Sequence, residues 1–296
     1  MSRFFQLLAL FPLSLMQHLG GVLGGLLWHL SPRWRGQIMA NVRQAGLPVA
    51  TGRAASKAAG TMLAELPWLW MRRPGVGVLD LVRWDGEAHF EAALDAGKGV
   101  ILALPHLGCW EMIGQSLAER YGPTRGPLVA LFRPARKAWL APLVAGSRNR
   151  PGLKAVPTSV AGVRSLIKVL RGGGYTAILP DQVPPAGQGV WAEFFGKPAY
   201  TMTLLPRLAQ QTGARVLLCW CERLGAGQGF VMHFEPLDAA ALADATAEPE
   251  AAARAVNEGM ERLITRCPQQ YLWSYARFKQ PQAEPTAAPG AGGAVS

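Results

Sequence analysis

The sequence has few acidic residues, few charged residues of any kind and few cysteines, and each shortage narrows the class of protein. Only 17% of the 296 residues are charged, and 19 acidic residues face 30 lysines and arginines, which gives a formal net charge of +11. Half of the residues are hydrophobic. A basic, apolar chain of this kind suits nucleic acid, an anionic membrane surface or acidic substrates as its partner.

The four cysteines do not form a disulfide framework. Cys219 and Cys221 flank a tryptophan in a strand-like run, so both thiols are expected on one face of a strand. This usage predicts free thiols in a reducing compartment. Cys109 stands between His106 and Glu111, but the spacing is not a usual one for zinc, and we expect neither a metal nor a bound organic cofactor.

Motifs for binding nucleic acid are also absent. The chain has no zinc-knuckle spacing, no Lys/Arg-Gly-Phe type of RNA motif and no basic helix of the helix-turn-helix kind. Ten tryptophans and an apolar N-terminal segment favour a membrane interface instead. We therefore expect no nucleic-acid partner.

Residues 4–30 are largely apolar and are about long enough to cross a bilayer. They lack the short apolar core and the small-residue cleavage site of a signal peptide. Pro12 and the pair Gln17–His18 interrupt the segment, so a kinked or interfacial helix is the alternative to a span. Arginines follow the segment closely, whereas Arg3 alone precedes it, and such an excess marks the cytoplasmic side. The sequence predicts a membrane-anchoring helix over residues 1–31, with the rest of the chain on the cytoplasmic face of the inner membrane.

Beyond this segment, strand-like apolar runs alternate with helical patterns, which is typical of α/β proteins. Strands are expected at residues 78–84, 100–104, 127–132, 175–179, 215–223 and 230–234, and helices at residues 50–70, 89–96, 163–170, 201–212 and 251–266. The prediction is an α/β fold with a mixed central sheet flanked by helices, in one domain over residues 32–280. Residues 281–296 are rich in Pro, Gly and Ala and are predicted to be disordered.

His106 and Glu111 stand directly after the apolar run 100–104, which Pro105 ends. The histidine is therefore expected on a strand-to-helix loop and the glutamate in the first turn of the next helix. We expect Nδ1–H of His106 to be donated to Glu111, which leaves Nε2 free to take a proton from a substrate hydroxyl. A structural histidine is the alternative, because this spacing often arises by chance.

Two further strand ends carry polar groups. Arg133 follows the run 127–132, and Asp181 follows the run 175–179. Active groups of α/β proteins gather at the carboxyl ends of their strands, so His106, Arg133 and Asp181 are expected near one another.

Four ordered blocks carry a resemblance to a known family. They are Pro-His-Leu-Gly-Cys-Trp-Glu at 105–111, Phe-Arg-Pro at 132–134, Pro-Asp-Gln at 180–182 with Phe-Phe-Gly at 194–196, and Gln-Gln-Tyr-Leu-Trp-Ser-Tyr-Ala-Arg-Phe-Lys at 269–279. With these blocks, the apolar N-terminus and the basic charge, the chain resembles the bacterial lipid A late acyltransferases of the lysophospholipid acyltransferase superfamily.

The resemblance implies transfer of a fatty acyl chain from acyl carrier protein to a hydroxyl of a lipid A precursor. The residues themselves do not separate this donor from acyl-CoA. It implies that His106 and Glu111 are the catalytic pair, and that Arg133, Arg148 and Asp181 contribute to substrate binding. Guanidinium groups match phosphate, so the two arginines are interpreted as phosphate clamps, with a solvated charged surface as the alternative. For Asp181, a loop cap or an orienting group is the alternative.

Other acceptors and other classes of protein stay open from the sequence. The stretch Gln182-Val-Pro-Pro-Ala after Asp181 is less polar than the family pattern, which leaves the acceptor and the acyl-chain length open. A lysophospholipid, an ornithine lipid or another glycolipid is the alternative acceptor. A non-catalytic lipid-binding relative and a thioesterase that uses Cys109 as nucleophile are the alternatives of another class.

Overall fold

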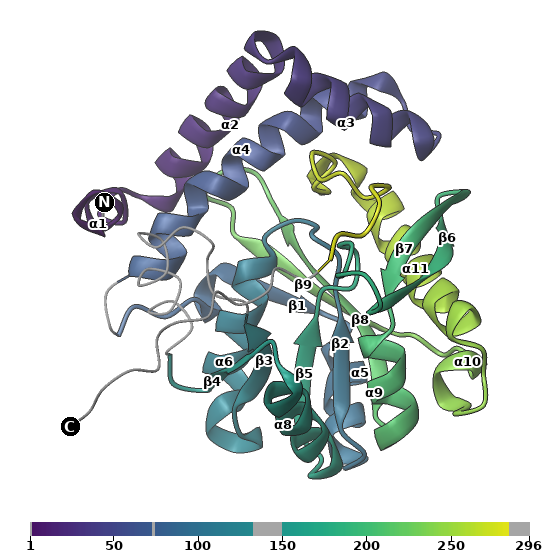
Figure 1. Ribbon diagram of the computed structural model, residues 1–296. Helices are drawn as coiled ribbons and strands as arrows, with labels where there is room; N and C mark the ends of the chain where they lie inside the picture. Colours follow the sequence, from purple (N-terminus) through teal and green to yellow (C-terminus); the bar gives the residue numbers. More distant parts are fainter. Residues whose placement is uncertain (1, 73–74, 133–149, 284–296) are drawn as a thin grey trace, which may run out of the picture.

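The computed structural model describes residues 2–72, 75–132 and 150–283, and these form a central sheet with helices on both faces (Figure 1). The strand order is β1-β9-β8-β2-β5-β3-β4. All neighbours in this order run parallel except β8 and β9, which pair antiparallel, so the sheet is mixed. The strands are β1 (Val82–Asp85), β2 (Val100–Ala103), β3 (Leu128–Phe132), β4 (Leu153–Pro157), β5 (Tyr175–Ile178), β8 (Arg215–Arg223) and β9 (Phe230–Pro236).

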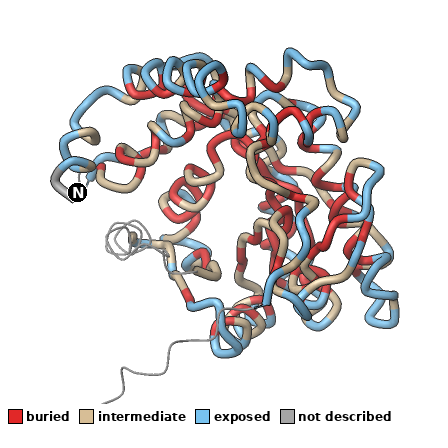
Figure 2. Tube along the Cα trace, turned by 45° about the horizontal axis from the view of Figure 1, so that its top comes forward, coloured by how far each residue is buried: buried red, intermediate tan, exposed pale blue. Residues whose placement is uncertain are grey.

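A hydrophobic core lies on each face of the sheet, as the buried residues in Figure 2 indicate. Alternate residues of β2 point to opposite faces, so Ile101 joins one core and Leu102 the other. The first core is covered by α8 (Val160–Arg171), α9 (Leu204–Thr212) and α11 (Pro249–Arg266), and the second by α5 (Glu87–Asp95) and α6 (Trp110–Arg125). Because β2 is buried on both faces, it is apolar throughout.

The N-terminal helices α1 (Ser2–Leu8), α2 (Leu13–Leu30), α3 (Pro32–Gln44) and α4 (Val49–Met71) gather at one end of the molecule (Figure 1). The single helix expected over residues 1–31 is two helices, because Pro12 supplies no backbone N–H and caps the start of α2. Within the described residues, no helix is both long enough and apolar enough to cross a bilayer. The anchoring role predicted for this segment is therefore not confirmed.

Several predicted elements are confirmed and others were missed. The helix expected at 50–70 is α4, and the strand expected at 215–223 is β8 with the same bounds. The sequence did not predict β4 or the separate hairpin of β6 (Gly189–Phe194) and β7 (Lys197–Met202). The short elements η1 (Leu79–Leu81), α10 (Ala240–Ala243) and η2 (Pro268–Gln270) complete the described fold. The expected disordered tail, residues 281–296, lies mostly outside the described residues.

Helices α2 and α4 pack closely because glycines face each other where they meet. A Cβ atom built on Gly24 would lie 2.2 Å from the backbone oxygen of Ser56, and one built on Gly60 would lie 2.2 Å from the backbone oxygen of Gly20. This close approach lets the hydroxyl of Ser56 donate a hydrogen bond to the backbone oxygen of Gly24, at 2.7 Å. The two helices can therefore approach only while these positions carry no side chain.

Replacing Gly24 by alanine is expected to lower the free energy of unfolding by about 1–3 kcal/mol, because the added methyl group meets backbone atoms that cannot move aside alone. The adjacent Gly25 is a matched control. Its Cβ would meet only the flexible side chain of Lys57, at 3.5 Å, so Gly25→Ala should leave stability unchanged or slightly higher. Denaturant unfolding of the two variants checks this, and equal midpoints would contradict the glycine packing.

Candidate active site

Two neighbouring strands of the sheet bring His106 and Asp181 together. Strand β2 pairs in parallel with β5, in a register that places Ala103 beside Ile178. The chain leaves both strands at the same edge of the sheet, and His106 and Asp181 each follow three residues after the strand end. The expectation that the side chains of His106 and Asp181 lie near one another is confirmed.

The imidazole of His106 is bound by Asp181. Nδ1 of His106 lies 2.7 Å from Oδ1 of Asp181, and the backbone N–H of His106 donates to Oδ2 at 2.8 Å. The expectation that Nδ1 pairs with Glu111 was therefore wrong. The carboxylate that follows β5 reaches Nδ1 because the pairing of β2 with β5 fixes both loops side by side, and spacing along the sequence does not reveal such a neighbour.

The side chain of Asp181 is buried, yet its surroundings favour the ionised carboxylate. Burial alone would raise its pKa, but the charge and hydrogen bonds of His106, together with the more distant charge of Arg277, outweigh burial and hold the pKa below its ordinary value. The pKa of Tyr271 is raised well above its ordinary value, by its own burial first and then by the negative charge of Asp181. An ionised Asp181 that accepts Nδ1–H fixes the tautomer of His106 in which Nε2 is an acceptor.

The second ring nitrogen of His106 faces Gln182. The side-chain nitrogen of Gln182 lies 3.1 Å from Nε2 of His106, so an amide N–H occupies the place where the hydroxyl of a substrate would donate its proton. The indole of Trp110 covers the imidazole edge-on, with ring centroids 5.0 Å apart. The imidazole is 15% exposed, so part of the ring is open to solvent.

Glu111 is the second residue of α6 and is half-buried. Its Oε2 accepts a hydrogen bond from the indole nitrogen of Trp70, in α4, at 3.1 Å. Glu111 is therefore in the first turn after the His106 loop, as expected, and connects this loop to the end of α4.

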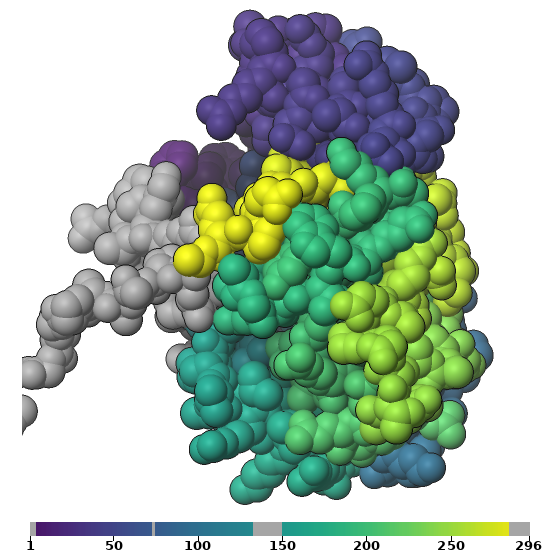
Figure 3. All heavy atoms as spheres, turned by 45° about the vertical axis from the view of Figure 1, so that its right-hand side comes forward, coloured from purple at the N-terminus to yellow at the C-terminus, as the bar shows by residue number. Residues whose placement is uncertain are grey.

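The loop that carries His106 is fixed from several parts of the chain. Gly108 has a φ of +65°, and a Cβ there would lie 1.9 Å from the backbone oxygen of Cys221, so only glycine fits. The N–H groups of Gly108 and Cys109 donate to the oxygens of Gln270 and Cys221. The oxygen of His106 accepts from the N–H of Leu272 at 3.0 Å. In Figure 3, the yellow C-terminal part of the described chain lies directly beneath the purple N-terminal helices.

A buried ion pair adds to this support. Arg223, at the end of β8, donates to both carboxylate oxygens of Glu65 in α4 at 2.6 Å and also to the oxygen of Gly108 at 3.3 Å. The Glu65 side chain is 0% exposed and that of Arg223 is 7% exposed. Burial alone would lower the pKa of Arg223, but the charge of Glu65 raises it above its ordinary value. Arg223 therefore stays charged, and its contacts with Glu65 and Gly108 tie α4 to the loop of His106.

Two of the predicted site residues, Arg133 and Arg148, lie outside the described residues. Arg150, the first described residue after them, donates to the backbone oxygens of Leu69 and Trp70 at the end of α4. Cys109 is 1% exposed, and burial raises its pKa well above the ordinary value. A buried neutral thiol of this kind is a poor nucleophile, which argues against the alternative of a thioesterase that uses Cys109.

Sequence reasoning missed several residues of the site. Gln182 was noted only as part of a block, although its amide faces His106, and Gln270 and Tyr271 were noted only within the block 269–279. Glu65 and Arg223 gave no signal, because they are 158 residues apart and neither belongs to a motif. The block 269–279 was the one available signal that the C-terminal part of the domain contributes to the site.

This arrangement contains the parts of a general base. An imidazole whose Nδ1–H is held by an ionised carboxylate can accept a proton at Nε2, and Asp181 stabilises the imidazolium that forms. The site therefore fits a reaction in which the hydroxyl of a substrate attacks an activated carbonyl.

Comparison with known proteins agrees with this chemistry. A family model described as bacterial lipid A biosynthesis acyltransferase matches residues 3–280. The chain is 28% identical over 281 residues to a lipid A biosynthesis acyltransferase of Haemophilus influenzae, with 91% of this chain and 83% of that protein covered. It is 24% identical over 232 residues to a lipid A biosynthesis lauroyltransferase of Escherichia coli, with 77% and 71% covered. It is also 33% identical over 154 residues to a phosphatidylinositol mannoside acyltransferase of Mycobacterium tuberculosis, with 50% and 46% covered.

Proposed function

Because this chain belongs to the bacterial lipid A biosynthesis acyltransferase family, we propose that it moves a fatty acyl chain from acyl carrier protein to a hydroxyl of a lipid A precursor. The chain is an acyltransferase whose relatives act on lipid acceptors. What we propose beyond family membership is the donor, acyl carrier protein, and the acceptor, a lipid A precursor. The observation that carries the proposal is the pairing of His106 with Asp181, which prepares a base for an acceptor hydroxyl.

In the proposed reaction, the acceptor hydroxyl takes the place of the Gln182 amide at Nε2 of His106. Nε2 removes the hydroxyl proton as the oxygen forms a bond to the thioester carbonyl carbon. The carbon–sulfur bond of the resulting tetrahedral intermediate then breaks, and the thiolate of the carrier takes the proton back from the imidazolium. Asp181 stabilises the imidazolium between these steps, and Glu111, which the family resemblance places in the catalytic pair, adds a second carboxylate to the His106 loop.

We further propose that the protein acts at the cytoplasmic face of the inner membrane and attaches through its N-terminal helices. The support is the surface of α1 and α2, where apolar side chains that would normally be buried face outward. The most exposed of them on α2 are Leu19, Val22, Leu23, Leu26 and Leu30. An interfacial helix with such a face binds a bilayer without crossing it.

The proposed function is tested with radiolabelled acyl–acyl carrier protein and a purified tetra-acyl lipid A precursor. Membranes that carry the protein should transfer label to the glycolipid, whereas membranes without it should not. Acyl-CoA in a parallel reaction identifies the preferred donor. Absence of transfer by intact protein with either donor would contradict the lipid A assignment.

A second acceptor class is favoured by one observation. Over half of its length the chain is 33% identical to a phosphatidylinositol mannoside acyltransferase. A mannosylated phospholipid is therefore the second candidate acceptor, with the same base and the same donor chemistry. Offering both acceptors in one reaction, followed by mass spectrometry of the lipids, separates the two because only the true acceptor gains an acyl chain.

The two carboxylates near His106 are expected to differ in their importance. Asp181→Asn removes the negative charge that holds Nδ1–H and should lower kcat by at least about 10²-fold. Glu111→Gln keeps an oxygen that accepts from Trp70 and should lower kcat less, because Glu111 does not hold Nδ1. Steady-state kinetics of the two variants check the order, and a larger loss in Glu111→Gln would make Glu111 the main acidic partner.

A further inference from the structure

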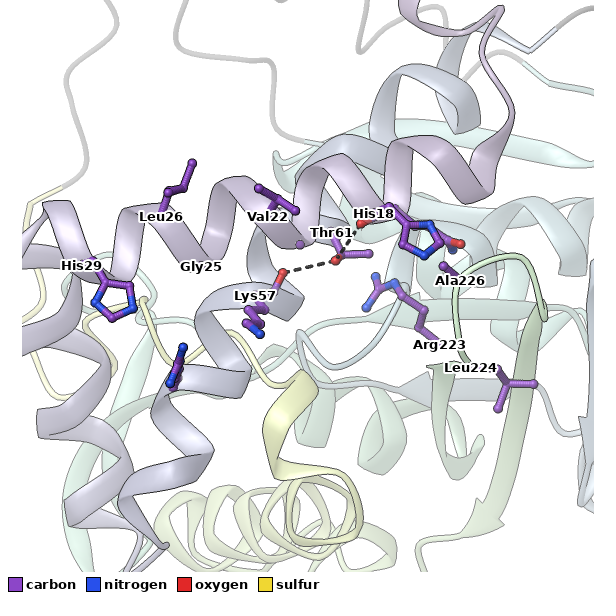
Figure 4. Close-up of a pocket in the computed structure, with 13 residues that line it drawn as sticks. His18, Val22, Gly25, Leu26, His29, Lys57, Thr61, Arg223, Leu224 and Ala226 are labelled. Carbon is purple, nitrogen blue, oxygen red and sulfur yellow. Dashed lines mark hydrogen bonds between the residues drawn. The ribbon is translucent and has the colours of Figure 1, made fainter.

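A groove of about 470 Å³ runs between α2 and α4, apart from the His106–Asp181 pair (Figure 4). Its walls come from α2 and α4, and the loop after β8 closes one end through Leu224 and Ala226. The glycine contacts between α2 and α4 hold these walls close together. Gly21 and Gly25 also line the groove and leave room in it, because neither carries a side chain.

Every ionisable residue that lines the groove is basic or a histidine. They are His18, His29, Arg53, Lys57 and Arg223, and no aspartate or glutamate from the described residues accompanies them in the lining. In the view of Figure 4, the side chains follow one another along the groove from His29 through Lys57 and Arg223 to His18. Arg53 and Lys57 therefore give the groove net positive charge, which suits an anion.

The two cations of α4 that line the groove have no partner of opposite sign within the described part of the chain. Arg53 and Lys57 are exposed, lie one helical turn apart and form no ion pair there. Arg223 is different, since its carboxylate partner Glu65 is buried behind it. Two cations on one helix face, unpaired and directed at the same space, repel each other until an anion joins them.

The rim of the groove is apolar. Val22 and Leu26 line it and are 60% and 50% exposed, and Leu19, Leu23 and Leu30 continue this exposed surface along α2. A ligand here would meet positive charge within the groove and apolar surface beside it. Free phosphate satisfies only the first condition, whereas a phospholipid satisfies both.

We propose that the groove binds one anionic phospholipid, with its phosphate and head group between Lys57, Arg53 and Arg223 and its acyl chains along the exposed leucines of α2. This site is distinct from the acyl-transfer reaction, although it rests on the proposed attachment of the N-terminal helices to a membrane. Such a site would make the N-terminal helices bind membranes that contain lipids of net negative charge more tightly than neutral membranes. It also places a lipid phosphate beside Arg223, the residue that donates to the oxygen of Gly108 in the His106 loop.

The test measures binding of short-chain phosphatidylglycerol, as dissolved monomers, to the full-length protein by calorimetry. Short-chain phosphatidylcholine and inorganic phosphate are the comparison ligands. Phosphatidylglycerol should bind and the other two should bind much more weakly. Because this readout does not need turnover, it stays informative even if acyl transfer to lipid A is not the reaction.

Matched variants separate the groove from general positive charge. Arg53→Gln with Lys57→Gln removes two cations one turn apart on α4, and Arg164→Gln with Lys168→Gln removes an equivalent exposed pair on α8, which lies at the opposite end of the molecule (Figure 1). The first double variant should bind phosphatidylglycerol about thirtyfold more weakly, at about 1 kcal/mol for each basic residue. The second should bind it like the wild type.

A third variant fills the groove without changing the charge. Gly25→Leu adds a side chain at a position whose Cβ meets only the flexible end of Lys57, so the helices can stay in place. It should weaken phosphatidylglycerol binding at least tenfold. The proposal is overturned if phosphatidylcholine or inorganic phosphate binds as well as phosphatidylglycerol, if both double variants lose binding equally, or if Gly25→Leu binds like the wild type.

Discussion

Alanine in place of His106 is expected to lower kcat by roughly 10²–10⁴-fold, which is the usual contribution of a positioned general base. The variant loses Nε2, the atom proposed to take the proton of the acceptor hydroxyl, and leaves Asp181 without the imidazole that it orients. KM for the acceptor should change much less, because the imidazole ring is a small part of any lipid-binding surface. The measurement is initial rates with acyl–acyl carrier protein and the glycolipid acceptor.

His233 provides a matched control for this result. Its ring nitrogens also contact carboxylates, at 2.8 Å from Asp85 and 3.1 Å from Glu222, and its side chain is 18% exposed, close to the 15% of His106. It lies on β9 and makes no contact with the His106–Asp181 pair. His233→Ala should therefore keep most of the activity. Near-normal transfer by purified His106→Ala would refute the proposed base.

The largest effect on stability is expected from Glu65→Leu. It removes the only carboxylate that pairs with Arg223 within the described chain and leaves a buried, charged guanidinium. Breaking one partner of a buried ion pair typically costs about 3–5 kcal/mol, because the remaining charge has neither water nor a counter-ion. Gln17 also loses a hydrogen bond, because its side-chain amide donates to Oε1 of Glu65 at 2.8 Å. Denaturant unfolding should show this loss directly.

A double variant distinguishes the cost of the unpaired charge from the loss of packing. Glu65→Leu with Arg223→Met leaves no buried charge and fills a similar volume, so it should be more stable than Glu65→Leu alone. It also removes the donor to the oxygen of Gly108, so activity should not recover to the same extent as stability. If the double variant is the less stable of the two, the cost comes from packing and not from the charge.

Most strands of the sheet, and the edge where His106 and Asp181 lie, could be predicted from the sequence because they depend on local patterns. The run 100–104 is apolar at every position since β2 is buried on both faces, and Pro105 ends it before His106. Asp181 follows β5 in the same manner, so a general rule for strand ends was enough to place the two residues together.

The partners of these residues depend on contacts between distant segments, and local patterns do not contain them. Glu111 is five residues from His106 and looked like its partner, yet Asp181, 75 residues away, binds Nδ1 through the pairing of two strands. The break in the N-terminal segment was visible at Pro12, whereas the glycine contacts between α2 and α4 were not, because glycines alone do not reveal which backbone they face.

The hydrogen bonds that fix the His106 loop also set an order of events during synthesis. Backbone groups of His106 and Gly108 pair with Leu272 and Gln270, and Asp181 lies within the electrostatic influence of Tyr271 and Arg277. On the ribosome, the N-terminal helices and β2 emerge long before these residues are translated, and the loop lacks its supports during that time. Under the proposed attachment, α2 of a nascent chain meets the membrane before the His106 loop has its supports. The His106 loop is complete only once the segment that contains Gln270 and Leu272 has been translated and has folded against it.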